Sequence, residues 1–263
     1  MRVPALRWVA GMTESAYYDT TSHWHSERFD AADQQHRFDV TASLIPADAR
    51  SLLDVGAGQG GFLKWLENHR PEMTLAGVER AQAAVDGAVC QTPIEVGTVE
   101  RLPYRDAAFD VVTALEVLEH LPLAAYNAGR AELERVARSL IVSVPHAERL
   151  AQVRCPDCGC RFHPNYHMRS FDLDSFGSLF DGFVLDRREV ISFDDYVGGT
   201  VIRAGYRLLR GGAAEMQPGN LCPQCGHRET ASGSVRNWAR RSVKTRLPKV
   251  SRPRWLLGRF VRR

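Results

Sequence analysis

The chain has 263 residues, of which 44% are hydrophobic and 25% are charged, the composition of an ordinary globular protein. No run approaches the roughly 20 apolar residues of a membrane-spanning helix, which argues against an integral membrane protein. The N-terminal apolar stretch is short and interrupted by Arg7, which disfavours a cleaved signal peptide. We therefore expect a cytoplasmic protein.

Charge is distributed unevenly along the chain. Residues 234–263 contain eleven Lys and Arg and no acidic residue, whereas the first 233 residues contain 23 basic and 31 acidic ones. A basic tail favours an anionic partner, either a membrane surface or a nucleic acid, and the alternative is a solvated extension. Apolar residues interleaved with basic ones suit a membrane interface or a nucleic acid, and we favour peripheral membrane contact because the acidic body argues against a long nucleic-acid track. The apolar residues are Trp238, Trp255, Leu256, Leu257, Phe260 and Val261.

Strand and helix patterns alternate through the first half of the chain. Short apolar runs predict strands, and apolar residues at helical spacing predict helices, one of which begins near Phe62. The predicted strands are 51–55, 74–78, 109–115 and 140–144, and the other predicted helices are 81–88 and 121–138. This alternation predicts an α/β domain with a doubly wound, mostly parallel sheet.

The alternation weakens after Pro145. Residues 172–180 have the pattern of a helix and 183–191 that of a strand, whereas 197–210 are ambiguous. The intervening segments are rich in cysteine and histidine and poor in apolar periodicity. We therefore expect the domain to be interrupted there by a different kind of structure.

A glycine-rich turn follows the first predicted strand. Asp54, Gly56, Gly58 and Gly60 lie where that strand leads into a helix, at the edge of the sheet where ligands bind. Glu79 ends the next strand, and its carboxylate could bind a ribose. Gly56, Gly58 and Gly61 also satisfy the dinucleotide pattern G-x-G-x-x-G. This turn alone therefore leaves S-adenosylmethionine and a nicotinamide cofactor as alternatives.

Residues 97–120, GTVERLPYRDAAFDVVTALEVLEH, resemble the corresponding segment of class I methyltransferases. The resemblance extends from about Tyr17 to Ile191, and it implies a Rossmann-like, seven-stranded fold that binds S-adenosylmethionine. Relatives usually carry an acidic residue near the adenine where this chain has Thr98. The resemblance implies that the cofactor is bound by Asp54, Gly56, Ala57, Gly58, Gly60, Glu79, Arg80, Thr98, Val99, Glu100 and Leu115.

The segment Glu116-Val117-Leu118-Glu119-His120 follows the strand at 109–115. If it is helical, Glu116, Glu119 and His120 share one face and could bind a divalent cation such as Mg²⁺. The segment resembles that of ubiquinone-pathway O-methyltransferases and of RNA 2′-O-methyltransferases, which implies His167 as a further ligand. Glu116, His120 and His167 are the predicted catalytic residues. The alternatives are a metal-free general base, His120 or His167, and carboxylates that only complement a helix N-terminus.

Two near copies of a C-P-x-C-G turn occur at Cys155–Cys158 and Cys222–Cys225. Each turn presents two thiolates, and the two together predict a structural Cys₄ zinc site. Disulfides are disfavoured in a cytoplasmic chain. Cys160, His163 or His227 could replace one of the four ligands.

The predicted organisation combines these elements. Near the N-terminus, Tyr17, Trp24 and His25 are expected to lie close to the substrate, and the alternative is a helix that packs on the domain through its aromatic residues. The predicted parts are an N-terminal helical cap (1–48), the cofactor-binding core (49–145), an insertion with the first knuckle (146–170), the remainder of the methyltransferase domain (171–210), the second knuckle (211–233) and a basic tail (234–263).

The function that these observations favour is S-adenosylmethionine-dependent O-methylation. The expected acceptor is a small-molecule, saccharide or lipid-linked hydroxyl, with structural zinc and Mg²⁺ as metals. The alternatives are an RNA-modifying methyltransferase, for which the zinc module and tail would bind RNA, and a non-catalytic zinc-containing binding protein. The intact glycine turn and Glu79 argue against the last of these.

Overall fold

The computed structural model describes residues 29, 31–196, 214–216, 220–229 and 249–263. The chain forms two compact units. The main unit comprises Tyr18–Arg149, Met168–Ile191 and Pro253–Arg263, and the small unit comprises Met1–Tyr17, Leu150–His167 and Ser192–Arg252.

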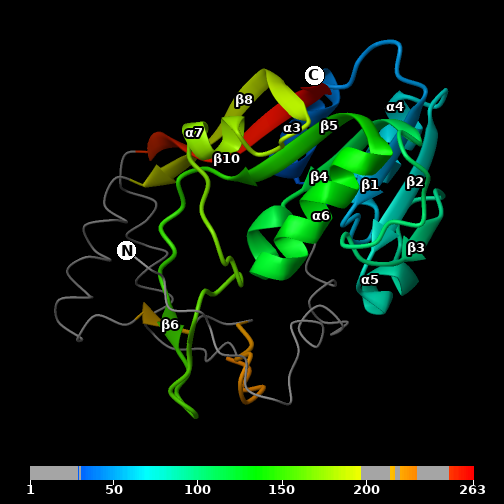
Figure 1. Cartoon of the computed structure of the whole chain (residues 1–263). Helices are drawn as coiled ribbons and strands as arrows, with labels where there is room; N and C mark the ends of the chain where they lie inside the picture. Colours follow the sequence, from blue (N-terminus) through cyan, green and yellow to red (C-terminus); the bar gives the residue numbers. More distant parts are fainter. Residues whose placement is uncertain (1–28, 30, 197–213, 217–219, 230–248) are drawn as a thin grey trace. The chain divides into compact units, whose positions relative to one another are not determined.

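The main unit is built on a seven-stranded sheet (Figure 1). In spatial order the strands are β3 (Ile94–Val96), β2 (Thr74–Glu79), β1 (Ser51–Val55), β4 (Phe109–Leu115), β5 (Ala137–Pro145), β10 (Lys249–Arg262) and β8 (Phe183–Tyr196). The first five pair in parallel, and β10 is antiparallel to β5. The predicted Rossmann-like, mostly parallel sheet is confirmed.

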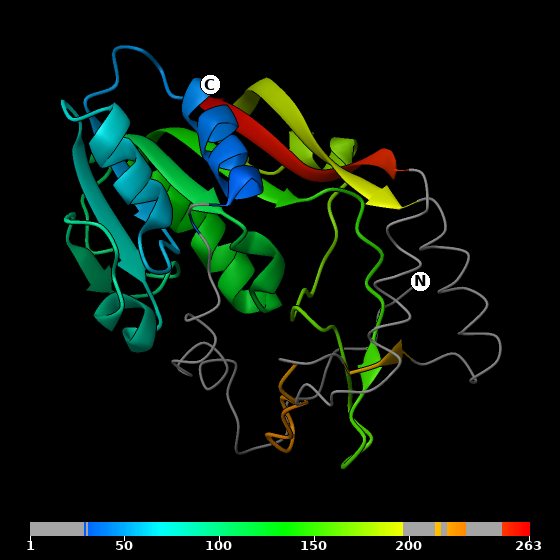
Figure 2. The ribbon, with the colours of Figure 1, turned by 180° about the vertical axis from the view of Figure 1, so that it is seen from behind.

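Helices cover both faces of this sheet, with α6 on one face and α3 and α4 on the other (Figures 1 and 2). The helices are α3 (Ala32–Ser43), α4 (Gly61–His69), α5 (Gln82–Asp86), α6 (Leu123–Val136) and α7 (Leu173–Gly177). The last is much shorter than the predicted helix at 172–180. It begins with a capping box, in which the Asp172 side chain and Ser175 bond each other's backbone amides.

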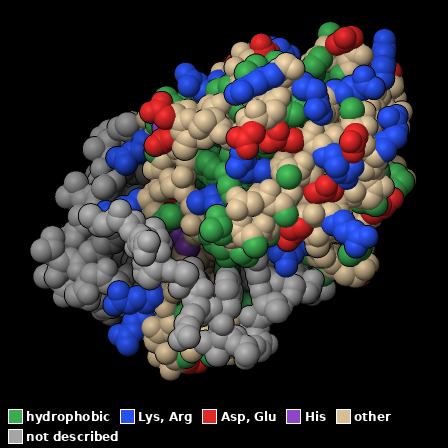
Figure 3. Space-filling view, in the orientation of Figure 1, with side chains coloured by type: hydrophobic (Ala, Val, Ile, Leu, Met, Phe, Trp, Pro, Cys, Tyr) green, Lys and Arg blue, Asp and Glu red, His purple; other side chains and the backbone are tan. Residues whose placement is uncertain are grey.

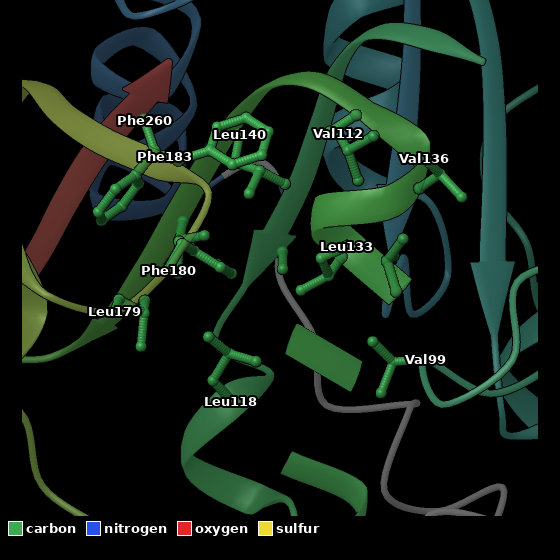
Figure 4. Close-up of a cluster of buried hydrophobic side chains, with 14 of the residues drawn as sticks. Val99, Val112, Leu118, Leu133, Val136, Leu140, Leu179, Phe180, Phe183 and Phe260 are labelled. Carbon is green, nitrogen blue, oxygen red and sulfur yellow. The ribbon is translucent and has the colours of Figure 1, made fainter. Parts of the chain in front are cut away.

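The main core lies between α6 and the face of the sheet that this helix covers (Figure 4). Leu133 and Val136 of α6 are fully buried, as is Leu140 of β5. Phe260 of β10 contacts the rings of Phe176 and Phe180, with centroid distances of 5.3 and 5.0 Å. Because both faces are covered, the central strands β1, β4 and β5 are buried along most of their length.

The last strand, β10, corrects the predicted tail. Trp255, Leu256, Leu257 and Phe260 are only 8, 0, 1 and 0% exposed, because this apolar run pairs with β5, with Leu256 opposite Val144. The prediction of a tail over 234–263 is therefore wrong from residue 249 onward, and these side chains are not available to a membrane interface.

The membrane contact itself stays a prediction, which now depends on residues such as Trp238 that lie outside the described part of the chain. On the face in Figure 3, basic and acidic side chains of described residues are interspersed rather than gathered into one band. Within the described ranges, no helix has both the length and the apolar character needed to cross a bilayer.

The hydrogen bonds of β10 and β8 show that the two strands run in opposite directions. The amide of Arg263, just after β10, donates to the carbonyl of Gly182, just before β8, at 3.1 Å. Arg259 likewise pairs with Asp186 of β8. Because β10 is antiparallel to β5, it begins at the sheet edge where β5 ends. The connections that follow β5 and precede β10 therefore both leave the sheet at its carboxyl edge.

The small unit has a three-stranded sheet in the order β7 (Arg161–Phe162), β6 (Val153–Arg154), β9 (Ala214–Glu215). Its described core is small and contains two of the knuckle cysteines. The buried residues of this core are Val153, Cys155, Phe162, Tyr166, Met216 and Cys222.

Two glycine substitutions test the packing of β10. A Cβ at Gly258 would lie 2.5 Å from Cε1 of Phe176 and 2.7 Å from a methyl of Leu185, whereas one at Gly177 would meet nothing within 4 Å. We expect Gly258→Ala to lower the free energy of unfolding by about 1–3 kcal/mol through overpacking. Gly177→Ala should leave it unchanged or raise it by up to about 1 kcal/mol. Urea unfolding of both variants measures the difference, and equal midpoints would contradict this account of β10.

Candidate active site

The glycine turn joins β1 to α4 at the carboxyl edge of the sheet. Gly56, Gly58 and Gly60 have φ angles of 76°, 55° and 79°, the left-handed region that favours glycine. The amides of Gly56 and Ala57 donate to the carbonyl of Val78 in β2 at 2.8 and 3.1 Å. The turn is thereby held against the end of the neighbouring strand.

Glu79, the last residue of β2, connects the glycine turn to the segment that follows β2. Its carboxylate accepts from the amide of Gly58 and from that of Ala81, both at 2.9 Å, and the residue is only 5% exposed. Burial raises the pKa of Glu79, and the two amide bonds oppose that rise. Each oxygen keeps a lone pair, so the carboxylate can still accept two hydroxyl donors.

Asp54 is the second buried acid of this edge. It is 3% exposed and accepts from the Thr113 hydroxyl of β4 at 2.6 Å. Burial, with a smaller contribution from the charge of Glu79, raises the pKa of Asp54 to about 6. A cation bound nearby would favour its ionised form.

The predicted adenine-side residues follow β3. Thr98 and Glu100 are exposed, whereas Val99 is 6% exposed and packs in the main core against α6 (Figure 4). Leu115 ends β4 at the carboxyl edge, and Arg80 directly follows β2. Of the three predicted residues Thr98, Val99 and Glu100, only Thr98 and Glu100 therefore have side chains that a ligand could contact.

The Glu116–His120 segment lies against the glycine turn. A Cβ on Gly56 would be 2.4 Å from Cγ2 of Val117, so the missing side chain at Gly56 makes room for this segment. The prediction of one helical face is wrong. Only Leu118–His120 form a short 3₁₀ helix, η1, and Glu116 precedes it with a φ of 58°.

Glu116 is fixed by two donors from neighbouring strands. The Ser143 hydroxyl of β5 donates to Oε1 at 2.8 Å, and the Trp255 indole of β10 donates to Oε2 at 2.7 Å. The guanidinium carbons of Arg37 and Arg254 lie 4.4 and 4.5 Å from the centroid of that indole. Sequence reasoning missed Ser143 and Trp255, and the only available signal was the apolar run around Trp255.

Glu119 is fully buried, and neither carboxylate oxygen has a hydrogen-bond partner among the described residues. Burial, together with the neighbouring charge of Glu116, raises its pKa well above the usual range. His120 Nε2 lies 3.8 Å from Oε1 of Glu119. An orphaned carboxylate beside a second carboxylate and an imidazole is either protonated or a ligand for a hard cation.

The remaining predicted residues lie outside the described main unit. His167 belongs to the small unit, where its ring stacks on His163 with 4.8 Å between centroids. Its grouping with Glu119 and His120 stays a prediction. Tyr17, Trp24 and His25 lie outside the described residues.

The four predicted zinc ligands gather in the small unit, with all four sulfurs within 4.8 Å of one another. The Cys155–Cys225 and Cys158–Cys222 sulfur distances are both 3.6 Å. A disulfide is about 2.05 Å long, whereas tetrahedral zinc–thiolate bonds of about 2.3 Å place sulfurs about 3.8 Å apart. The cluster therefore fits a metal and not a disulfide.

The two knuckles repeat the same backbone geometry. Gly159 and Gly226 both have a φ of 73°, and their amides donate to the carbonyls of Cys155 and Cys222 at 3.1 and 3.0 Å. Nδ1 of His227 lies 2.7 Å from Asp157, which links the second knuckle to the first. Cys160 is not one of the clustered four.

Comparison with known proteins identifies a family model that matches part of the chain. Residues 53–140 match the family model described as a methyltransferase domain. O-methyltransferase resE of Aspergillus sclerotiorum is 26% identical over 167 residues, which cover 59% of this chain and 61% of that protein. The chain thus spans less than two thirds of the length of this curated relative.

Solved structures share the fold at low identity. Magnesium protoporphyrin IX methyltransferase of Synechocystis PCC 6803, solved with bound S-adenosylmethionine, superposes with a TM-score of 0.51 at 18% identity. The match covers 70% of this chain and 93% of that one. The [4+2]-cyclase SpnF superposes with a TM-score of 0.57 at 15% identity, over 94% and 93% of the two chains.

The cyclase shows that this fold alone does not fix the reaction. Residues 53–140 nevertheless match the methyltransferase family model, and they contain the glycine turn and Glu79. This part of the chain is a methyltransferase domain, in a sheet with the Rossmann-like fold of the class I, S-adenosylmethionine-dependent enzymes.

Proposed function

We propose that this protein transfers the methyl group of S-adenosylmethionine to a hydroxyl oxygen of a small-molecule, saccharide or lipid-linked acceptor. The observation that carries the cofactor is the Glu79 carboxylate, which accepts from the Gly58 amide across the glycine turn and keeps a free lone pair on each oxygen. Two adjacent ribose hydroxyls match that arrangement.

Each side chain of the edge has a part in the proposed reaction. The glycine turn lets the cofactor approach the backbone, and Asp54 offsets its positive charge. Methyl transfer from a sulfonium is an in-line displacement, so the protein mainly aligns the acceptor oxygen and removes its proton. Glu116, held at a defined position by Ser143 and Trp255, and His120 are the proposed proton acceptors.

A divalent cation such as Mg²⁺ fits the same edge. Glu119 would bind it with an orphaned, buried carboxylate, and His120 would be its described neighbour in the donor set. Glu116 stays a predicted ligand, because its two oxygens already accept from Ser143 and Trp255. His167 remains the further predicted ligand. When bound, the cation would lower the pKa of an acceptor hydroxyl.

The cofactor proposal is tested by calorimetric titration with S-adenosylmethionine, with and without Mg²⁺. Glu79→Gln removes one acceptor from the proposed ribose contact and should weaken binding about tenfold or more. Glu72→Gln is the matched control, because Glu72 lies two residues before the start of β2, away from the carboxyl edge, and its side chain is 45% exposed. Tight binding that survives Glu79→Gln would contradict the assigned ribose contact, and no binding by folded wild type would contradict the function.

Asp54 predicts how cofactor affinity depends on pH. Burial raises the pKa of Asp54 to about 6, so the empty protein takes up a proton there as the pH falls below about 6. A cationic cofactor prefers the carboxylate, so its affinity should rise between pH 5 and 7 and then level off. Calorimetry across this range should show the rise in wild type and a flatter profile in Asp54→Asn. Parallel profiles would exclude Asp54 as the titrating group.

For the cysteine cluster we propose a structural zinc ion bound by Cys155, Cys158, Cys222 and Cys225. Four ligands leave no open position for catalysis. Metal analysis of the purified protein should give one zinc per chain, lost in Cys222→Ser and retained in Cys160→Ser. Retention in both variants would contradict the assigned ligand set.

A further inference from the structure

A short segment, residues 162–169, connects the cysteine cluster to the Glu119–His120 turn. Its first part belongs to the core of the small unit and its last part to the main unit. His167 and Met168, where the two units meet in the chain, are consecutive. The part of the segment that belongs to one unit is therefore followed directly in the chain by the part that belongs to the other.

The small-unit end of the segment is built into the cluster. Phe162 and Tyr166 are 2 and 4% exposed and pack in one core with Cys155 and Cys222. Their rings lie 5.8 Å apart. The Tyr166 hydroxyl donates to the carbonyl of Leu221, the residue before Cys222.

Hydrogen bonds extend this order to the last residue of the small-unit part. The amide of Tyr166 donates to the carbonyl of His163 at 2.9 Å, and that of His167 to Nδ1 of His163 at 3.2 Å. Asn220, from the second knuckle, donates to the carbonyl of Pro164 at 3.3 Å. The turn at 163–167 is therefore held by the same residues that surround the cysteines.

The main-unit end holds the η1 turn. The amide of Met168 donates to the carbonyl of Glu119 at 2.7 Å, and Arg169 Nη1 donates to that of Leu118 at 2.6 Å. Helix ends leave carbonyls without intrahelical donors, and these two bonds supply them. The Arg169 guanidinium also lies 3.9 Å from the centroid of the Tyr126 ring of α6.

We propose that Met168 and Arg169 are positioning residues for the Glu119–His120 turn, and that the folded cysteine cluster fixes them through residues 162–167. The inference deepens the proposed function, because it rests on the role of that turn in methyl transfer and gives the cluster a purpose in it. The order of the acceptor side of the site would then depend on a cluster that does not touch the substrate.

Hydrogen exchange of backbone amides tests the positioning role without an identified acceptor. In Arg169→Ala, the amides of Met168 and His120 should exchange about tenfold faster or more, while those of β4 stay unchanged. Arg169→Lys should restore part of the protection, since it keeps a cationic donor. Unchanged exchange in Arg169→Ala would overturn the positioning role.

Arg262→Ala is the matched control. Arg262 also donates to backbone carbonyls, those of Glu134 and Ala137 at 2.9 and 2.8 Å, and lies 5.0 Å from the centroid of an aromatic ring, that of Phe183. The Arg262→Ala variant should leave the amides of Met168 and His120 as protected from hydrogen exchange as they are in wild type. Faster exchange of these two amides in the control would attribute the effect to general destabilisation and overturn the proposal.

Phe162→Ala tests the transmission from the cluster. It creates a cavity in the core of the small unit, and the exchange of Met168 and His120 should rise with that of residues 153–162. Faster exchange confined to residues 153–162 would overturn the proposal that the cluster fixes Met168 and Arg169. Neither this variant nor Arg169→Ala depends on bound metal, so a zinc-free protein would contradict the proposed zinc and still leave the inference decided by these two measurements.

Discussion

The left-handed turn at Gly56 is the constraint on which the rest of the site depends. Any side chain there would collide with Val117, because a Cβ would lie 2.4 Å from its methyl carbon. The close approach of these two segments brings the ends of β1 and β4 together, and the Glu79 carboxylate ties the end of β2 to the same turn. The proposed cofactor-binding and acceptor-side residues therefore share one edge of the sheet, which is what aligned transfer between two bound molecules requires.

Three buried acids at this edge, Asp54, Glu79 and Glu119, share one electrostatic feature. Burial raises the pKa of each of them, and two have a neighbouring carboxylate as a further cause. An empty site thus contains carboxyl groups that are costly to ionise. A cationic cofactor, or a divalent cation at Glu119, would offset that cost, so ligand binding and ionisation should be coupled. Such groupings are commoner at functional sites than in ordinary cores.

Local patterns in the sequence predicted what local physics determines. The strand–turn–helix at Gly56 and the two cysteine knuckles were found because their residue spacings define a backbone geometry over a few residues. The strand β10 was missed because its pairing partner, β5, lies about a hundred residues earlier, and a basic apolar run without its partner resembles an interfacial segment. Trp255 was therefore assigned to a tail instead of to Glu116.

The helical face predicted for Glu116–His120 failed for a different reason. Spacing predicts a shared face only if the backbone stays helical, and Glu116 has a positive φ that no sequence pattern of non-glycine residues announces. Asp110, in the segment that most resembles the family, illustrates the reverse case. Its carboxylate accepts from the amides of Arg50 and Ser51 at the opposite edge of the sheet, so that part of the motif marks structure and not chemistry.

The small unit follows from where the chain leaves the sheet. The segment after β5 supplies one knuckle and the segment between β8 and β10 supplies the other, and these two insertions are far apart in the sequence. Six buried residues form the described core of the unit. Four thiolates on one metal ion would add to the stability of this core and fix the two insertions to each other. The segment that leads back from this cluster ends on the carbonyls of Leu118 and Glu119, so a metal ion that orders the cluster would also help to order the proposed acceptor edge.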